Sequence, residues 1–234
     1  MENKKTIIGI IIVIVLIIAL VVVSYLYSEF SNKQLNILKE ETNTILQSNI
    51  VTDEINSEIK ADKNFGVIEK AIKEYTSEIR NRYIEINKID SELNPNEIFS
   101  AEKLQDSNMD DINKIIDEYK KQTQKISLEC KEQIKEENII KNIESQNIKQ
   151  RKTYYEDLYK TIMLSETMKK QYETITSEID KKEQQIYNKL EKLKNIENYL
   201  KNNKEFWTIK DNKVQFSNIN KMTEYYNLVN ELLG

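Results

Sequence analysis

The start of the chain divides into a short polar tail and one long apolar stretch. No charged residue occurs from Thr6 to Ser28, and Ile7–Val23 contains only apolar residues and one glycine. A bilayer core about 30 Å thick is spanned by roughly 20 apolar residues in a helix. The pattern therefore predicts a transmembrane anchor over residues 6–28, with the tyrosines at 25 and 27 at the membrane interface and residues 1–5 as a tail.

A cleaved signal peptide is the competing interpretation of this segment. Signal peptides have an apolar core of about 7–15 residues and a small-residue cleavage site, whereas this run is longer and Val22-Val23-Ser24 is a poor site. An uncleaved anchor is favoured. The basic residues Lys4 and Lys5 place the N-terminus in the cytoplasm by the positive-inside rule. Residues 29–234 then form an extracytoplasmic body at the plasma membrane, and the chain crosses once.

Beyond the anchor, apolar residues recur at intervals of three and four, as on the packed faces of helices. The clearest series has one polar member, and consists of Ile68, Ile72, Tyr75, Ile79, Arg82, Ile86, Ile89 and Leu93. A second has two, and consists of Tyr172, Ile175, Ile179, Lys182, Ile186, Lys189, Leu193, Ile196 and Leu200. The polar members either set the register of the helices or mark a partly exposed seam.

Two further series are less regular. One follows the anchor, predicts that its helix continues into the body, and consists of Leu35, Leu38, Ile45, Ile55 and Ile59. The other begins near Ser107, has Asp110 and Asp111 in its first turn, and consists of Ile112, Ile115, Ile116, Tyr119, Ile126 and Ile134. Most of the 13 tyrosines are expected in these seams rather than on a binding surface.

Three segments are expected to separate the helices. Residues 61–66 contain a glycine and predict a turn, and the only proline, Pro95, predicts that a helix stops before Asn94. Apolar density falls between Asn142 and Lys152, where a further turn is expected. The result is three or four long helices in an elongated antiparallel bundle or coiled coil.

Residues 207–216, "WTIKDNKVQF", depart from this helical pattern. A two-residue turn at Asp211-Asn212 makes a β-hairpin in which Ile209 faces Val214 and Trp207 faces Phe216. These four side chains share one face, and an isolated hairpin is marginal in water, so that face is expected to dock on the helices.

A final helix over residues 218–233 is predicted after the hairpin. Ser217 or Asn218 can cap it. Its apolar stripe is expected to consist of Ile219, Met222, Tyr226, Val229 and Leu233, widened by Leu228 and Leu232. The hairpin and this helix together form a clasp on the bundle, with structural roles for Trp207, Phe216 and Tyr226. An exposed ligand-binding ribbon is the alternative. The fold class is all-α, with this one small hairpin.

The clasp carries a resemblance to a known group of proteins. The tryptophan, the tight turn, "VQF" and "EYYNLVNEL" resemble the C-terminal end of uncharacterised helical bacterial envelope lipoproteins of the cell-wall-binding type, over residues 205–233. The resemblance implies an extracytoplasmic location and no catalytic residue. The chain departs from that group because no lipid-bearing cysteine follows the apolar run.

The composition excludes most classes of catalytic and metal-binding site. The chain has no His and one Cys, which excludes His-based catalysis, His-ligated metals and thiolate zinc clusters. Phosphate-cradling glycine motifs are absent. Carboxylate pairs such as Glu136-Glu137 are expected by chance among 39 acidic residues. We therefore expect no enzyme activity and no catalytic, cofactor-binding or metal site. Cys130 is expected to fill a helix position, with Glu129 raising the pKa of its thiol.

Charge argues against nucleic acid as a partner, because the net charge is −4 and a duplex binder needs excess Lys and Arg. The one basic cluster, Lys149 to Lys152, is read as a solvated helix face. The leading hypothesis is a non-catalytic membrane-anchored tether. It contacts the lipid bilayer through residues 6–28, binds an envelope protein or the cell wall, and can also self-associate. The alternatives are an extracytoplasmic ligand sensor working through a partner, and a cytoplasm-facing scaffold of reversed topology.

Overall fold

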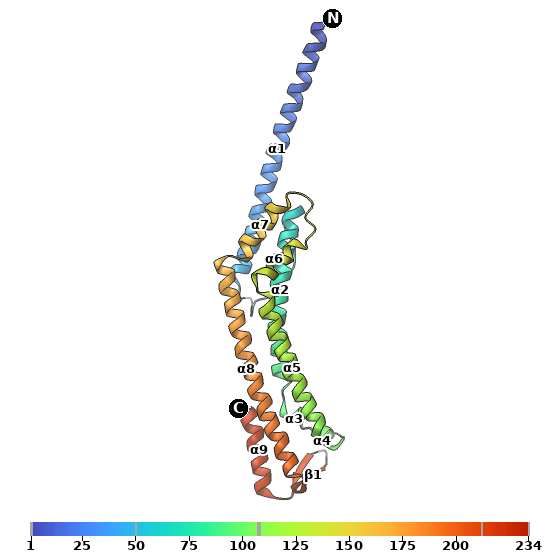
Figure 1. Ribbon diagram of the computed structural model, residues 1–234, viewed down its shortest axis with the longest axis vertical. Coiled ribbons are helices and arrows are strands. Elements are labelled where there is room, and N and C mark those ends of the chain that lie inside the picture. Colours follow the sequence, from blue (N-terminus) through green and yellow to red (C-terminus); the bar gives the residue numbers. More distant parts are fainter. Residues whose placement is uncertain (1, 50, 107–108, 212, 234) are drawn as a thin grey trace. The chain divides into compact units, whose positions relative to one another are not determined.

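The computed structural model describes residues 2–49, 51–106, 109–211 and 213–233, with side chains from Val15 onward except at 105–110. Within these ranges the chain is largely helical, with one antiparallel pair of strands (Figure 1). The elements are α1 Glu2–Gln47, α2 Lys63–Glu92, α3 Pro95–Ile98, α4 Ala101–Asp106, α5 Met109–Gln133, α6 Glu136–Glu144, α7 Lys152–Met163, α8 Glu166–Asn202, the 3-10 helix η1 Lys204–Phe206, β1 Trp207–Lys210, β2 Lys213–Phe216 and α9 Ile219–Leu233. The all-α fold with one hairpin is confirmed.

The contacts divide the chain into two compact units. Unit 1 comprises Met1–Tyr75 and Ile140–Ser165, and unit 2 comprises Thr76–Ile139 and Glu166–Gly234.

In unit 1, α1 continues without a break from the apolar segment into the body, as the sequence predicted. Its inward positions recur at spacings of three and four and are Gln34, Leu38, Thr42 and Ile45. The predicted extension of this seam to Ile55 and Ile59 was wrong. Both lie in the segment between α1 and α2, where Ile59 is exposed. Two of the four inward positions are polar, which explains why the apolar spacing alone gave a weak signal.

The turn expected over residues 61–66 lies earlier than predicted. Helix α2 begins at Lys63, so Gly66 stands in its first turn. Glycine is required there because a Cβ at position 66 would lie 2.4 Å from the carbonyl oxygen of Ala61. The glycine therefore permits the incoming chain to pass closely over the start of the helix.

A buried polar cluster fixes the segment before α2. The carboxylate of Glu69 accepts the backbone amides of Lys60 at 3.0 Å and Ala61 at 2.7 Å. The ammonium of Lys73 lies 2.6 Å from the Glu69 carboxylate and 2.7 Å from that of Glu41 on α1. Burying these charges is tolerated because each is paired and hydrogen-bonded. The cluster joins α1, α2 and the segment between them.

Unit 1 is completed by the end of α6 and by α7. The ring of Tyr155 packs edge-on against Phe65 at a centroid distance of 5.1 Å, and Asn142 donates to the Tyr159 hydroxyl at 2.8 Å. The turn expected between 142 and 152 is confirmed, because α6 ends at Glu144 and α7 begins at Lys152. The helical interpretation of residues 149–152 was wrong, since all but the last lie in the loop before α7.

The helices of unit 2 run antiparallel to one another, as polar residue pairs between them show. Along α5 and α8, Asn113 pairs with Glu197 and Ser127 with Glu183, so the residue numbers run in opposite directions. The pairs Gln133–Glu78 and Arg82–Glu129 give the same relation between α2 and α5. The pairs Lys192–Glu231 and Tyr199–Lys221 give it between α8 and α9.

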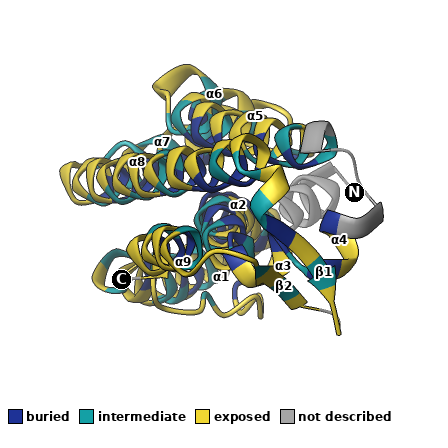
Figure 2. Cartoon of the chain, turned by 90° about the horizontal axis from the view of Figure 1, so that it is seen from below, coloured by how far each residue is buried: buried dark blue, intermediate teal, exposed yellow. Residues whose placement is uncertain are grey.

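The two clear apolar seams form the buried faces of α2 and α8. Every apolar member of both series is buried, with exposed fractions of 6% or less. Figure 2 shows the buried positions alternating with exposed ones around these helices. On α5 the inward positions include three small residues that the spacing did not single out, Thr123, Ser127 and Cys130.

The boundaries that involve proline follow the prediction, whereas two others were missed. Helix α2 ends at Glu92, and the Asn94 side chain caps α3 by accepting the Asn96 amide at 3.0 Å, with Pro95 in the first turn. The expected start at Ser107 lies outside the described residues, and α5 is described from Met109. The breaks between α5 and α6 and between α7 and α8 contain no Gly or Pro, so nothing local marked them.

The hairpin register is the predicted one. Trp207 pairs with Phe216 and Ile209 with Val214. Asp211 has φ of 51° in the turn, and Asn212 lies outside the described residues. The Trp207 indole is buried at 2% exposure and donates to the carbonyl oxygen of Leu200 at 2.8 Å, which ties the hairpin to the end of α8.

Helix α9 docks as expected, but through a different face. Asn218 caps it by accepting the amide of Asn220 at 2.9 Å. The buried residues are Tyr225, Val229 and Leu232, whereas Tyr226 is 48% exposed. The predicted stripe was correct at Val229 and Leu232, which are buried, and wrong at Ile219, Tyr226 and Leu233, which are exposed. The Tyr225 ring instead packs on Phe216, at a centroid distance of 5.3 Å.

Candidate functional site

The first functional feature is the exposed apolar part of α1. Its large side chains from Val15 to Tyr27 are all exposed, between 43% and 69%. An 18-residue window in the described part of this helix has a mean hydropathy of 1.7 and no buried position. An apolar surface that stays exposed in the protein needs another apolar environment. By length and composition this helix can span a membrane, and a signal sequence would show the same properties.

A cavity of about 430 Å³ lies in unit 1 where the apolar part of α1 ends. We call it the junction cleft. It is lined by Tyr27 and Phe30 of α1, Lys63 of α2, Lys149 of the loop before α7, and Tyr155 of α7. Asn64 and Gln150 also line it, and the Asn64 amide donates to the Gln150 carbonyl at 2.9 Å. That bond holds the start of α2 against the loop that leads into α7.

Two cations lie over aromatic rings in or beside the junction cleft. The Lys63 ammonium lies 4.5 Å from the centroid of the Phe30 ring, and the Arg151 guanidinium lies 4.7 Å from that of Tyr154. A hydrogen bond with the Tyr27 hydroxyl raises the pKa of Arg151. Burial raises the pKa of Tyr155 to about 12. At neutral pH Arg151 is therefore charged and Tyr155 is a neutral phenol.

The N-termini of α2 and α7 both lie beside this cleft. Neither helix has an acidic residue in its first turn, and the side chain of Arg151 makes no capping hydrogen bond to α7. Helix N-termini carry partial positive charge and usually attract acids. Lys63 and Arg151 adopt left-handed conformations, with φ of 53° and 51°, which is unfavourable for residues with a Cβ.

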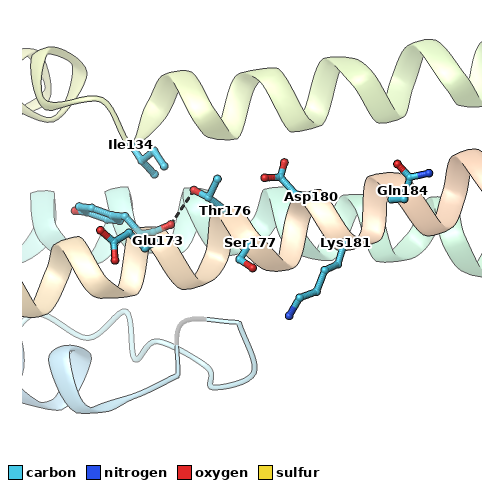
Figure 3. Close-up of a pocket in the computed structure, with 8 residues that line it drawn as sticks. Ile134, Glu173, Thr176, Ser177, Asp180, Lys181 and Gln184 are labelled. Carbon is cyan, nitrogen blue, oxygen red and sulfur yellow. Dashed lines mark hydrogen bonds between the residues drawn. The ribbon is translucent and has the colours of Figure 1, made fainter.

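A second hollow, about 650 Å³, runs along α8 in unit 2 (Figure 3). Glu173, Thr176, Asp180 and Lys181 of α8 line it together with Ile134, at the break after α5. These α8 side chains project from successive turns in Figure 3. The Lys131 ammonium lies 2.6 Å from the Asp180 carboxylate, so this acidic member of the lining is already paired.

The polar members of the two seams have partners. Asp90 on α2 accepts from Lys189 at 2.6 Å and from Lys182 at 3.2 Å, both on α8. Burial raises the pKa of Asp90, but these two hydrogen bonds outweigh that effect and hold it below its usual range. Arg82 bridges Glu85 and Glu129. The lysines thus fix the register of α8 against α2 within unit 2.

The lone cysteine occupies a packed position, as expected. Cys130 has no exposed surface, and burial raises the pKa of its thiol to about 11. The predicted cause was Glu129, whereas the cause is burial, with a smaller contribution from Asp180. A thiol of this kind is a poor nucleophile at neutral pH.

Among the described side chains, no group of three or more acidic or cysteine residues is placed to hold a metal ion. Comparisons with family models, curated proteins and solved structures gave no match. The resemblance to envelope lipoproteins therefore stays a prediction. The sequence did not single out the junction cleft, because its cations come from segments far apart in the chain.

Proposed function

We propose that this chain is a single-pass, non-catalytic tether of the plasma membrane, with its N-terminus in the cytoplasm and its helical body outside. One observation carries the proposal. Helix α1 passes without interruption from the exposed apolar segment to Leu38, which is fully buried in unit 1. Leu38 lies eleven positions after Tyr27 in the helix, which is about 16 Å at a rise of 1.5 Å per residue. Unit 1 is therefore held next to the bilayer by a continuous helix.

A domain held in this way meets nearby partners at a raised effective concentration. The partner we propose is an envelope protein or the cell wall, and the resemblance of residues 205–233 to envelope lipoproteins supports that choice. The hollow along α8 offers a surface for such contact, and its mixed lining suits a transient interface. Crosslinking in intact cells from a photoreactive residue at Thr176 or Gln184 is expected to capture the partner. A probe at the exposed Lys121, on α5, is the control.

The anchor is tested by alkaline extraction of membranes. The wild type is expected to stay in the membrane pellet with its N-terminal residues intact by mass spectrometry. Changing Leu16 and Ile17 to Lys adds about 2.5–3.5 kcal/mol per residue to the cost of insertion and is expected to release the chain. The matched control changes the exposed Ile84 and Ile219 of the body to Lys. A mature chain that lacks the apolar segment would refute the anchor.

Protease treatment of intact cells tests the orientation. Loss of the body is expected for the outside placement, and its survival would instead support the cytoplasm-facing scaffold. The sensor alternative draws on cavity size, since hollows of about 380–650 Å³ fall in the range of small-molecule sites. A large thermal shift of the full-length protein with one small molecule would favour the sensor over the tether.

A further inference from the structure

We propose that the junction cleft binds the phosphate headgroup of an anionic lipid in the leaflet next to the body. This inference rests on the anchoring part of the proposed function and deepens it. It does not depend on which side of the membrane the body occupies, because the cleft follows the apolar segment in either orientation. The cleft would make the anchor selective for lipid, in addition to holding the chain in the bilayer.

The position of the cleft along α1 carries the first step. About 20 helical residues cross the hydrocarbon core, so a core that begins near Ile7 ends near Leu26. Tyr27 and Phe30, which line the cleft, then lie within one turn beyond the core. That depth is occupied by lipid headgroups. The cavity of about 430 Å³ is therefore placed at phosphate level by the same helix that spans the membrane.

The charges around the cleft carry the second step. Lys63 and Lys149 line it, and Arg151 reaches the Tyr27 hydroxyl at its edge. Two of the neighbouring acids have other partners, and the exposed Glu29 lies on α1 between Tyr27 and Phe30. Asp62 accepts from Gln34 at 3.3 Å, and Glu156 pairs with Lys152 at 3.4 Å.

The N-termini of α2 and α7 add backbone amide donors, and neither helix has an acidic residue in its first turn, although Asp62 directly precedes α2. The aromatic rings provide the remaining match, because Tyr27 and Tyr154 are amphipathic and partly exposed, as residues at a membrane interface usually are. An apolar ligand would not match the three cations, and a soluble anion would not account for the rings or for the position beside the anchor. A lipid with a phosphate headgroup satisfies both the charge and the apolar surface.

Full-length protein in lipid nanodiscs provides the test. Nanodiscs of phosphatidylcholine alone are compared with nanodiscs containing phosphatidylglycerol, and hydrogen exchange of the peptides around Lys63 and residues 147–155 is measured. Native mass spectrometry of the detergent-extracted protein counts the retained phosphatidylglycerol. The variant K63Q/K149Q/R151Q is compared with K121Q/K170Q/K194Q, which removes the same charge from exposed positions of unit 2.

Phosphatidylglycerol is expected to slow exchange in the cleft peptides and to remain bound to the wild type and the control. A basic residue near an anionic surface contributes about fivefold to binding, so the cleft variant is expected to bind on the order of 100-fold more weakly. Circular dichroism equal to that of the wild type shows that the variant is folded, and the single change K149Q, which keeps both helix starts, is expected to show about a fivefold loss.

Three results would overturn the inference. Equal retention of phosphatidylglycerol by the cleft variant and the control would show general attraction only. Slowed exchange on adding inorganic phosphate to phosphatidylcholine nanodiscs would assign the cleft to a soluble anion. Protection that is the same in both lipids would show no headgroup preference. Alkaline extraction tests the anchor separately in each case. Release of the chain from membranes would contradict the proposed function. A chain that stays in the membrane but shows no lipid selectivity would contradict only this inference.

Discussion

The neighbouring tyrosines of α9 allow a direct test of which face docks on unit 2. Tyr225 is 8% exposed and packs on Phe216, whereas Tyr226 is 48% exposed. Changing Tyr225 to Ala removes a buried aromatic ring and leaves a cavity, for which comparable truncations cost about 3–5 kcal/mol. We expect about 3 kcal/mol, at the lower end, because the phenol hydroxyl is lost with the ring. Changing Tyr226 to Ala removes mostly hydrated surface and one edge contact with Tyr225, at 5.4 Å, and is expected to cost less than about 1 kcal/mol.

The assay uses the only tryptophan of the chain, which lies in the hairpin beside this helix. Denaturant unfolding of the full-length protein in detergent, followed by Trp207 fluorescence, reports on unit 2, and circular dichroism reports on the helices together. A loss of about 3 kcal/mol in the free energy of unfolding would also lower the Tm of a domain of this size by roughly 6–12 °C in thermal unfolding. If Tyr226→Ala proved as costly as Tyr225→Ala, the helix would dock through the stripe that the spacing predicted, and the arrangement described here would be refuted.

Three further perturbations test other parts of the fold. Asp90→Asn is expected to cost about 1–2 kcal/mol at neutral pH by breaking the contacts with Lys189 and Lys182. Folding lowers the pKa of Asp90, so the difference in stability between wild type and variant is expected to be complete above about pH 5 and to vanish as the pH falls through the pKa of the folded state. Urea unfolding at several pH values measures this difference. A difference that stays constant down to pH 2 would contradict the prediction. Gly66→Ala places a Cβ 2.4 Å from the backbone oxygen of Ala61 and is expected to loosen the segment before α2. Faster hydrogen exchange in that segment would show the effect. Ala71→Gly is the control for helix propensity. Cys130 is expected to react with a thiol reagent at pH 8 only as fast as the protein opens, and rapid labelling of the native protein would show that the thiol is not buried.

Local patterns in the sequence were enough to predict an element wherever one physical rule dominates. The uncharged run predicted an apolar helix, since few other structures satisfy the backbone N–H and C=O groups within lipid. The two regular seams predicted the buried faces of α2 and α8, because their spacing of three and four matches one side of a helix. Pro95 placed a boundary by removing a backbone donor, and the Asp-Asn turn fixed the hairpin register.

Tertiary structure decided what depends on residues distant in the chain. The buried face of α9 is set by Phe216 and by α8, and these neighbours turn Tyr225 inward although the spacing favoured Tyr226. The role of the polar seam residues required Asp90, which lies more than 90 residues before either lysine. The junction cleft exists only because α1, α2 and the loop before α7 converge in unit 1. A sequence determines the periodicity of each helix, but the partner that covers a face, or the cations that meet in one cavity, are set by how the helices pack.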